Sequence, residues 1–322
     1  MSRLKKSLVY LLSLTLFGIF YQTPFCCDEA YSQESNIQYV NQIGMKGVEK
    51  GQLTNPHSLA VDKFGNIFVG DTGNKRVQKF SSNGTFITSW GSEGNKSGQF
   101  MGLHDVAVDP EGKFVYTVEL KNHRVQKFNS NGSFITYWEY NGTGGRDVNR
   151  APHQIAINSL GNVYLTDSNG NQLLKYHNNG TFIGTIGSEG TEGGKFNTPH
   201  GIAFDRSDNM YITDMKNYRI QVFDNNDNFD REWKSSGIGL DKFSETVPGI
   251  AIDSKNHVYI VDKINSRVQM FDNMGNHLAS WGTDGKDPQQ LHKPEDIAVS
   301  NEGTVYVTDT RNSRIQVLQV VE

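Results

Sequence analysis

Cysteine is almost absent from this chain of 322 residues, and the two that occur, Cys26 and Cys27, are adjacent and close to the N-terminus. The remainder of the chain therefore has neither a disulfide framework nor a thiolate metal site. Basic charge is also scarce, because 35 Asp and Glu outnumber 31 Lys and Arg to give a formal net charge of −4. A mildly acidic chain is a poor candidate for generic nucleic-acid binding, so we expect no nucleic-acid partner.

Apolar runs long enough to cross a bilayer are lacking as well. The stretch from Leu8 to Phe20 follows three basic residues and is too short to span a membrane comfortably, a combination typical of a signal peptide. Ala30 and Ser32 supply small residues for cleavage after Ser32. We therefore predict a signal peptide over residues 1–32, with an uncleaved anchor as the alternative, and an exported domain over residues 33–322. The protein is expected to be secreted or held at the cell surface, with no membrane span unless the N-terminal segment is retained.

The chain does contain one pattern of residues that recurs six times, at a spacing of 47 to 49. Two of the six rows read PHSLAVDKFGNIFVGDTGNKRVQKF and PHGIAFDRSDNMYITDMKNYRIQVF. Each row carries one acidic residue at the same place: Asp71, Glu119, Asp167, Asp214, Asp262 and Asp309. Repeats of this length with several short strand patterns indicate an all-β fold, a six-bladed β-propeller.

Each repeat is predicted to form one blade of four antiparallel strands. In the first repeat the strands are expected at Ser58 to Asp62, Asn66 to Asp71, Arg76 to Phe80 and Phe86 to Gly91. An Asn-Gly pair joins the third strand to the fourth in the first three repeats, and a tight turn of this kind needs positive φ at both central residues. The last repeat stops after its third strand, while the segment Ile37 to Gly44 resembles a fourth. We expect this N-terminal strand to close the ring.

Through its recurring PHGIAFD, MYITD and NYRIQVF segments the chain resembles the NHL-repeat family of six-bladed propellers, from about Gln52 to Leu318. The resemblance implies the architecture. Proteins of this kind include peptide-processing lyases and scaffolds for proteins, RNA and ligands, so it leaves the function open.

Strand direction predicts which side chains share a face. The innermost strand begins at the Pro-His segment and the second strand returns to that face at its acidic residue, so both surround one mouth of the central channel. Equivalent positions hold His57, His104, His153, His200, Pro248 and Glu295. Alternate blades then bring together His104, His200 and Glu295, a set that suits zinc or another divalent ion with an open position for water. The alternative is that each His bonds neighbouring backbone at the mouth.

The Pro-His segments also resemble those with which peptidylglycine amidating lyases hold a catalytic zinc ion from alternate blades. His200 matches that motif and His104 matches it with Leu103 in place of Pro, whereas Glu295 replaces the third His. The lyases carry an Arg directly after a second-strand acid. Here those positions hold Thr72, Leu120, Ser168, Met215, Lys263 and Thr310.

Five of the repeated acids precede an arginine by five residues, which predicts five bidentate pairs that fix the loop between strands two and three. Asp167 instead precedes Gln172. It is a candidate ligand-binding acid, unless another residue replaces the missing arginine. The same loops carry Lys75, Lys121, Lys216, Lys263 and Arg311, a broken ring of positive charge that could attract an anionic ligand. The alternative is that these are solvated loop side chains.

No Ser-His-Asp order, phosphate-binding glycine loop or EF-hand loop stands out. The leading hypothesis is a secreted or cell-surface, noncatalytic binding scaffold for a protein, glycan or small anionic ligand at the channel mouth. The alternative is a metal-dependent lyase or hydrolase at the same mouth, whose cofactor would be one divalent ion such as zinc.

Overall fold

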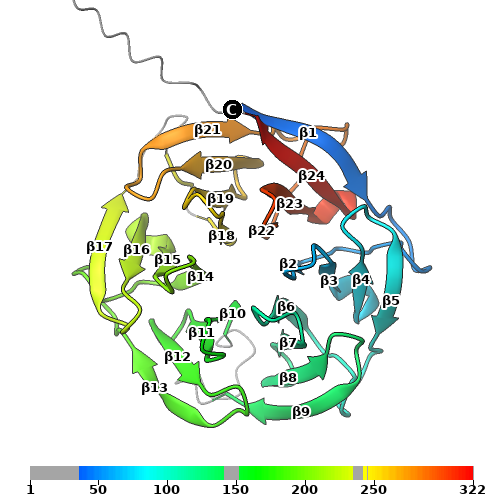
Figure 1. The fold of residues 1–322 in the computed structure, drawn as a ribbon, viewed down its shortest axis with the longest axis horizontal. Coiled ribbons are helices and arrows are strands. Elements are labelled where there is room, and N and C mark those ends of the chain that lie inside the picture. Colours follow the sequence, from blue (N-terminus) through cyan, green and yellow to red (C-terminus); the bar gives the residue numbers. More distant parts are fainter. Residues whose placement is uncertain (1–35, 141–151, 235–241, 245, 322) are drawn as a thin grey trace, which may run out of the picture. The chain divides into compact units, whose positions relative to one another are not determined.

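The computed structural model describes residues 36–140, 152–234, 242–244 and 246–321, and these residues form six four-stranded antiparallel sheets. The sheets are arranged as blades around a central channel (Figure 1). The prediction of an all-β, six-bladed propeller is confirmed. The predicted signal peptide, with Cys26 and Cys27, lies outside the described residues, whereas Glu34–Glu322 forms one compact unit. Among the described residues no helix is both long and apolar enough to cross a membrane.

Strands follow one another from the channel outward in every blade, and we number the blades from the first repeat. Blade 1 comprises β2 (Ser58–Val61), β3 (Ile67–Asp71), β4 (Arg76–Phe80) and β5 (Phe86–Trp90). Blade 2 comprises β6 (Leu103–Val108), β7 (Phe114–Glu119), β8 (Arg124–Asn129) and β9 (Phe134–Glu139). Blade 3 comprises β10 (Ile155–Ile157), β11 (Val163–Asp167), β12 (Gln172–Tyr176) and β13 (Phe182–Ile186).

The second half of the ring repeats this order. Blade 4 comprises β14 (Pro199–Phe204), β15 (Met210–Asp214), β16 (Arg219–Phe223) and β17 (Phe229–Lys234). Blade 5 comprises β18 (Ile250–Ile252), β19 (Val258–Asp262), β20 (Arg267–Phe271) and β21 (His277–Trp281). Blade 6 comprises β22 (Ile297–Val299), β23 (Thr304–Asp309), β24 (Arg314–Val321) and, as its outermost strand, β1 (Asn36–Ile43). Short 3-10 turns follow three second strands: η1 (Thr72–Asn74), η3 (Met215–Asn217) and η4 (Thr310–Asn312).

The N-terminal strand closes the ring, as the sequence predicts. β1 pairs antiparallel with β24, from Asn36 opposite Val321 to Ile43 opposite Ile315 (Figure 1). Ile37 and Ile43 are both buried. The first and last described strands of the chain are therefore held in one blade, and the outermost edge of β24 is covered.

The core of the propeller lies between the blades. Across the described ranges, six buried hydrophobic clusters occupy the six interfaces between neighbouring blades. All residues of β3, β11, β15 and β19 are buried, because both faces of a second strand pack against a neighbouring blade. Outermost strands are more exposed, as in β13, where three of the five residues are exposed and none is buried. This arrangement leaves the innermost strands and the loops at their ends free to form sites.

One detail of the predicted hairpins is wrong. The Asn-Gly segments do connect the third and fourth strands, but only the glycines have positive φ, +84° at Gly84, +87° at Gly132 and +88° at Gly180. The Gly84 N–H donates to the Ser81 carbonyl and the Ser81 N–H to the Thr85 carbonyl. The turn is therefore a longer loop with one left-handed glycine, and it is accompanied by an irregularity between Lys79 and Phe80.

Candidate functional site at the central channel

Four imidazoles form an arc at one mouth of the channel, on the loops and strand ends where the sequence predicts them. Ring centroids are 4.2 Å apart for His57 and His104, 5.1 Å for His104 and His153, and 4.6 Å for His153 and His200. His104 and His200 are 6.3 Å apart. We call these four residues the histidine mouth. Each is half buried, so the ring edges remain in part accessible.

Hydrogen bonds fix the tautomer of the histidine mouth. Nδ1 lies 3.0 Å from the His104 carbonyl in His57, 2.8 Å from the His153 carbonyl in His104 and 3.1 Å from the Pro248 carbonyl in His200. A carbonyl only accepts, so Nδ1 carries the proton in all three rings. In His153 the partner of Nδ1 is the Ser168 hydroxyl, which itself donates to the Pro199 carbonyl, so here too Nδ1 donates. The bare nitrogen of each ring is therefore Nε2.

Burial keeps the histidine mouth neutral. It lowers the pKa of His104 and His200 well below the ordinary value, and the neighbouring imidazoles lower it further. Burial also lowers the pKa of His153, to about 4, and that of His57, where the Glu295 carboxylate opposes it. At neutral pH the mouth therefore offers hydrogen-bond acceptors rather than positive charge.

The three predicted metal ligands line one small cavity. His104, His200 and Glu295 share it with His57. The Glu295 carboxylate forms an ion pair with Lys263 and lies 3.9 Å from Nε2 of His57. Throughout the described residues, no three His, Cys, Asp or Glu side chains are placed to hold one ion. The three ligands therefore stay a prediction.

The predicted ring of positive charge lies on the loops after the second strands, but its members differ. Lys121, Lys216 and Arg311 are exposed. Lys75 is half buried, and its Nζ donates to the Gly73 carbonyl at 2.8 Å. Lys263 is paired with Glu295, which joins the ring of charge to the histidine mouth.

The five predicted acid–arginine pairs are present, but not in the predicted bidentate form: Nε contacts the carboxylate, while the terminal nitrogens donate to the loop that enters the blade, as Nη2 of Arg76 does to the Glu49 and Gln52 carbonyls. The distances from the arginine Nε to the carboxylate are 2.8 Å for Arg76 and Asp71, 2.6 Å for Arg124 and Glu119, 2.8 Å for Arg219 and Asp214, 3.0 Å for Arg267 and Asp262, and 2.7 Å for Arg314 and Asp309. Asp167 is buried and accepts from the Gly170 N–H at 2.9 Å and from the Gln172 amide at 3.2 Å. In blade 3, Gln172 thus occupies the position that an arginine occupies in the other five blades.

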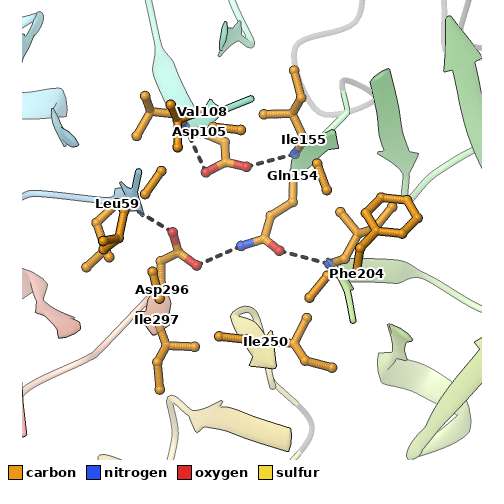
Figure 2. Close-up of a pocket in the computed structure, with 18 of the residues that line it drawn as sticks. Leu59, Asp105, Val108, Gln154, Ile155, Phe204, Ile250, Asp296 and Ile297 are labelled. Carbon is orange, nitrogen blue, oxygen red and sulfur yellow. Dashed lines mark hydrogen bonds between the residues drawn. The ribbon is translucent and has the colours of Figure 1, made fainter. Parts of the chain in front are cut away.

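A layer of three buried polar side chains crosses the channel below the histidine mouth, and the sequence did not predict it. Asp105, Gln154 and Asp296 occupy the position directly after the His or Glu of their blades. Each accepts a backbone N–H of the next blade, from Ile155 at 2.8 Å, Ile202 at 3.0 Å and Leu59 at 2.9 Å respectively. The Gln154 amide also donates to Asp296 at 3.0 Å (Figure 2). We call these three residues the channel floor.

The channel floor divides the channel chemically. Beyond it lies a cavity of about 220 Å³ whose walls are Ala, Val, Leu, Ile and Phe side chains from all six innermost strands (Figure 2). Burial raises the pKa of Asp105 well above its ordinary range, and the Asp296 carboxylate adds to this. Burial raises the pKa of Asp296 to about 7. One side of the floor thus carries the imidazoles of the mouth, and the other is lined by apolar side chains together with Asp105, Gln154 and Asp296 themselves.

Three of the six repeats match a known repeat family. Residues 53–80, 196–223 and 291–318 match the NHL repeat. The B-box type zinc finger protein ncl-1 of Caenorhabditis elegans is 36% identical over 66 residues, which are 20% of this chain and only 8% of that protein.

Solved structures resemble nearly the whole propeller. A streptogramin B lyase structure superposes with a TM-score of 0.59 at 12% identity, over 89% of this chain and 98% of that one. Virginiamycin B lyase from Staphylococcus aureus gives 0.57 at 13% identity, over 89% and 100% of the two chains. A gluconolactonase from Xanthomonas campestris gives 0.59 at 12% identity, over 89% and 97%. At such identities the likeness concerns the fold.

Proposed function

Because the chain is an NHL-repeat six-bladed β-propeller, we propose that it is a noncatalytic binding scaffold, secreted or held at the cell surface, which recognises its ligand at the histidine mouth. The ligand is a protein segment, a glycan or a small molecule that bears an anionic group. Propeller folds serve many functions, so the proposal depends on the site and not on the fold.

The proposal is carried by one observation: the neutral imidazoles of the histidine mouth lie above the channel floor, and cationic side chains surround them. Four imidazoles with protonated Nδ1 leave Nε2 as an acceptor for hydroxyl or amide donors. Lys121, Lys216 and Arg311 are exposed on the loops at the same end of the blades and suit an anionic group. The channel floor lies directly beneath, so a ligand would rest in the mouth rather than pass through.

The test compares cations of the two faces. In one variant Lys121, Lys216 and Arg311 become Ala; in the matched control Lys63, Lys113 and Lys255, on turns of the opposite face, become Ala. Binding of polygalacturonate and of poly-glutamate is measured by calorimetry at two salt concentrations. We expect the first variant to bind at least one of them about tenfold more weakly, a loss that shrinks in high salt, and the control to bind as the wild type does. Weakening only in the control would place recognition on the other face.

A metal-dependent lyase or hydrolase is the second candidate, favoured by the Nε2 atoms of His104 and His200 beside Glu295 in one cavity. Structures named as lyases and a gluconolactonase share the fold. Elemental analysis of protein purified without chelators decides between the candidates. An enzyme of this kind would hold one ion per chain, lost in His104→Ala and in His200→Ala but kept in the control His177→Ala, whose ring is exposed. No bound ion after addition of zinc, manganese and calcium would exclude it.

A further inference from the structure

Lysines of the third strand link three pairs of neighbouring blades. Lys79, Lys127 and Lys175 stand opposite Phe68, Tyr116 and Tyr164 in the register of the second and third strands. Nζ lies 4.9 Å, 5.2 Å and 5.0 Å from the centroid of the opposite ring. Each ammonium group therefore sits over an aromatic ring of its own blade.

The same ammonium groups reach the hairpin of the next blade. Nζ of Lys79 donates to the Ser130 carbonyl at 3.3 Å and Nζ of Lys127 to the Asn178 carbonyl at 2.9 Å. Nζ of Lys175 pairs with Asp227, in the hairpin of blade 4. An alkyl ammonium held between a ring and the following hairpin is thus a repeated contact of this propeller.

Blades 4 to 6 carry Val222, Met270 and Val317 at the lysine position. Blade 4 replaces the lysine with Arg231 of its outermost strand, whose guanidinium lies 6.0 Å from the centroid of Tyr211 and donates to the Asn273 carbonyl of the next hairpin. After blade 5 there is no such hairpin, because the outermost strand of blade 6 is β1.

Between blades 6 and 1 both the ring and the hairpin are present, without a cation from any of the described residues. Tyr306 stands opposite Val317, and Ser82 occupies the hairpin position that Ser130 has in blade 2. A cavity of about 440 Å³ lies there, lined by these three residues among others and by no Lys or Arg of the described chain. Within the same described ranges, no hydrogen bond ends on the Ser82 carbonyl.

An acidic group completes the cavity. Glu302 lines it and is exposed. Glu302 and Tyr306 line the same cavity. Burial raises the pKa of Tyr306, and the Glu302 carboxylate raises it further. Ring, carbonyl and carboxylate together are complementary to one alkyl ammonium.

We propose that the cavity between blades 6 and 1 binds a lysine side chain of a partner protein. The butyl stem would lie along Val317, and the ammonium would take the place between Tyr306 and the Ser82 carbonyl that Lys79 and Lys127 fill at their own interfaces. The site includes the Ser82 hairpin, on the face opposite the histidine mouth, so it does not depend on the function proposed for that mouth.

The probe is the blocked tripeptide acetyl-Gly-Lys-Gly-amide, compared with its norleucine analogue, which keeps the stem and lacks the charge. Titration is followed by backbone amide NMR of the full chain. We expect saturable shifts at Ser82 and its hairpin neighbours with the lysine peptide, and about two- to fivefold weaker binding in Glu302→Gln. Equal shifts with both peptides, or none, would overturn the proposal. Tighter binding of n-butylammonium than of the peptide would overturn the protein partner in favour of a small amine.

Two variants use the repeat itself as a control. Val317→Lys restores the lysine of blades 1 to 3, so the cavity fills from within; the shifts should vanish and the melting temperature should rise. Lys79→Val empties the corresponding place between blades 1 and 2, so the lysine peptide should then shift amides near Ser130 as well. A folded Val317→Lys protein that binds the peptide unchanged, or a folded Lys79→Val protein without new shifts near Ser130, would contradict the proposed site.

Discussion

Buried charge in this propeller is surrounded by hydrogen-bond partners, and Arg219, which is surrounded by acceptors, shows how completely. The residue is 1% exposed, and Nε lies 2.8 Å from Asp214. The other guanidinium nitrogens donate to Glu232 and to the carbonyls of Thr191, Glu192 and Lys195. One side chain thus ties the acid of the second strand to the loop that enters blade 4.

Arg219→Met should lower the free energy of unfolding by about 3–5 kcal/mol, because it leaves the buried Asp214 carboxylate without its cation. Urea denaturation followed by tryptophan fluorescence measures the change. Lys113→Met, at an exposed turn, should stay within about 0.5 kcal/mol of the wild type. Adding Asp214→Asn to Arg219→Met should recover part of the loss. A loss below about 1 kcal/mol would mean that water or neighbouring amides solvate Asp214 instead.

The sequence predicted these pairs because acid and arginine keep one spacing in five repeats. It did not show that Asn74 and Gln78 donate to the Asp71 carboxylate, which Arg76 also contacts. Counterparts of Asn74 and Gln78 do the same in other blades. Those contacts depend on both strands turning the same face toward the loop, which spacing alone does not fix. The channel floor was missed for a related reason. Asp105, Gln154 and Asp296 share a repeat position with Ser58, Gly201 and Gly249, so the pattern carries no common chemistry.

Asp296 makes stability depend on pH. Burial raises its pKa from 3.8 to about 7, with Glu295 adding to the rise. Between these values the native state keeps a proton that the unfolded chain loses. This contribution to stability is therefore complete at low pH and falls as the pH rises, by at most about 1.4 kcal/mol per pH unit. Asp296→Asn removes it.

Unfolding of wild type and Asp296→Asn should be compared from pH 5 to pH 8. We expect the variant to gain stability relative to the wild type across this range. The neutral histidines titrate in both proteins, so their opposite contribution cancels in the difference, while Asp105 remains as the neighbouring acid. Parallel pH profiles would show that the Asp296 carboxyl is already ionised, or that the unfolded chain shares its pKa.

At the scale of the element, the hairpins between third and fourth strands join the blades as well as the strands. Gly132 has φ +87°, and a Cβ there would lie 2.4 Å from the indole of Trp90 in the preceding blade. Gly180 stands in the same relation to Trp138. The glycine is thus needed twice, for its backbone conformation and for the close approach of a ring. The Asn-Gly pair predicted the place of the turn but not its type, because this pair occurs in loops of several lengths and not only in two-residue turns.

Three glycine-to-alanine variants separate these two needs. Gly184→Ala should change stability by less than about 0.5 kcal/mol, since its φ is not positive and nothing lies within 4 Å. Gly98→Ala, with φ +76° and open space, should lose about 1 kcal/mol through the backbone alone. Gly132→Ala should lose more than either, about 2–4 kcal/mol, because strain and clash combine. Thermal unfolding measures all three. Equal losses for Gly98 and Gly132 would show that Trp90 moves aside freely.

At the scale of the whole molecule, the closure of the ring by β1 was predictable because the IQYVNQIG segment repeats a strand pattern that the last repeat lacks. What the closure does to stability is a separate matter. In an open array each repeat contacts only its neighbours, and the ends can unfold first. Here Ile37 of β1 packs in one buried cluster with Tyr259 and Val305, so blade 6 joins blade 5 through the N-terminal strand.

A closed ring should therefore unfold as one unit, which tryptophans in different blades can report. Trp281 packs against the cluster that contains Ile37, whereas Trp138 belongs to the cluster between blades 2 and 3. Ile37→Ala should cost about 2–4 kcal/mol, and Val40→Ala, at 53% exposure in the same strand, almost nothing. In single-tryptophan proteins that keep either Trp138 or Trp281, the urea midpoint should fall equally with Ile37→Ala, because opening one interface removes the closure on which all six blades depend. A fall at Trp281 alone would show that the blades unfold separately despite the closed ring.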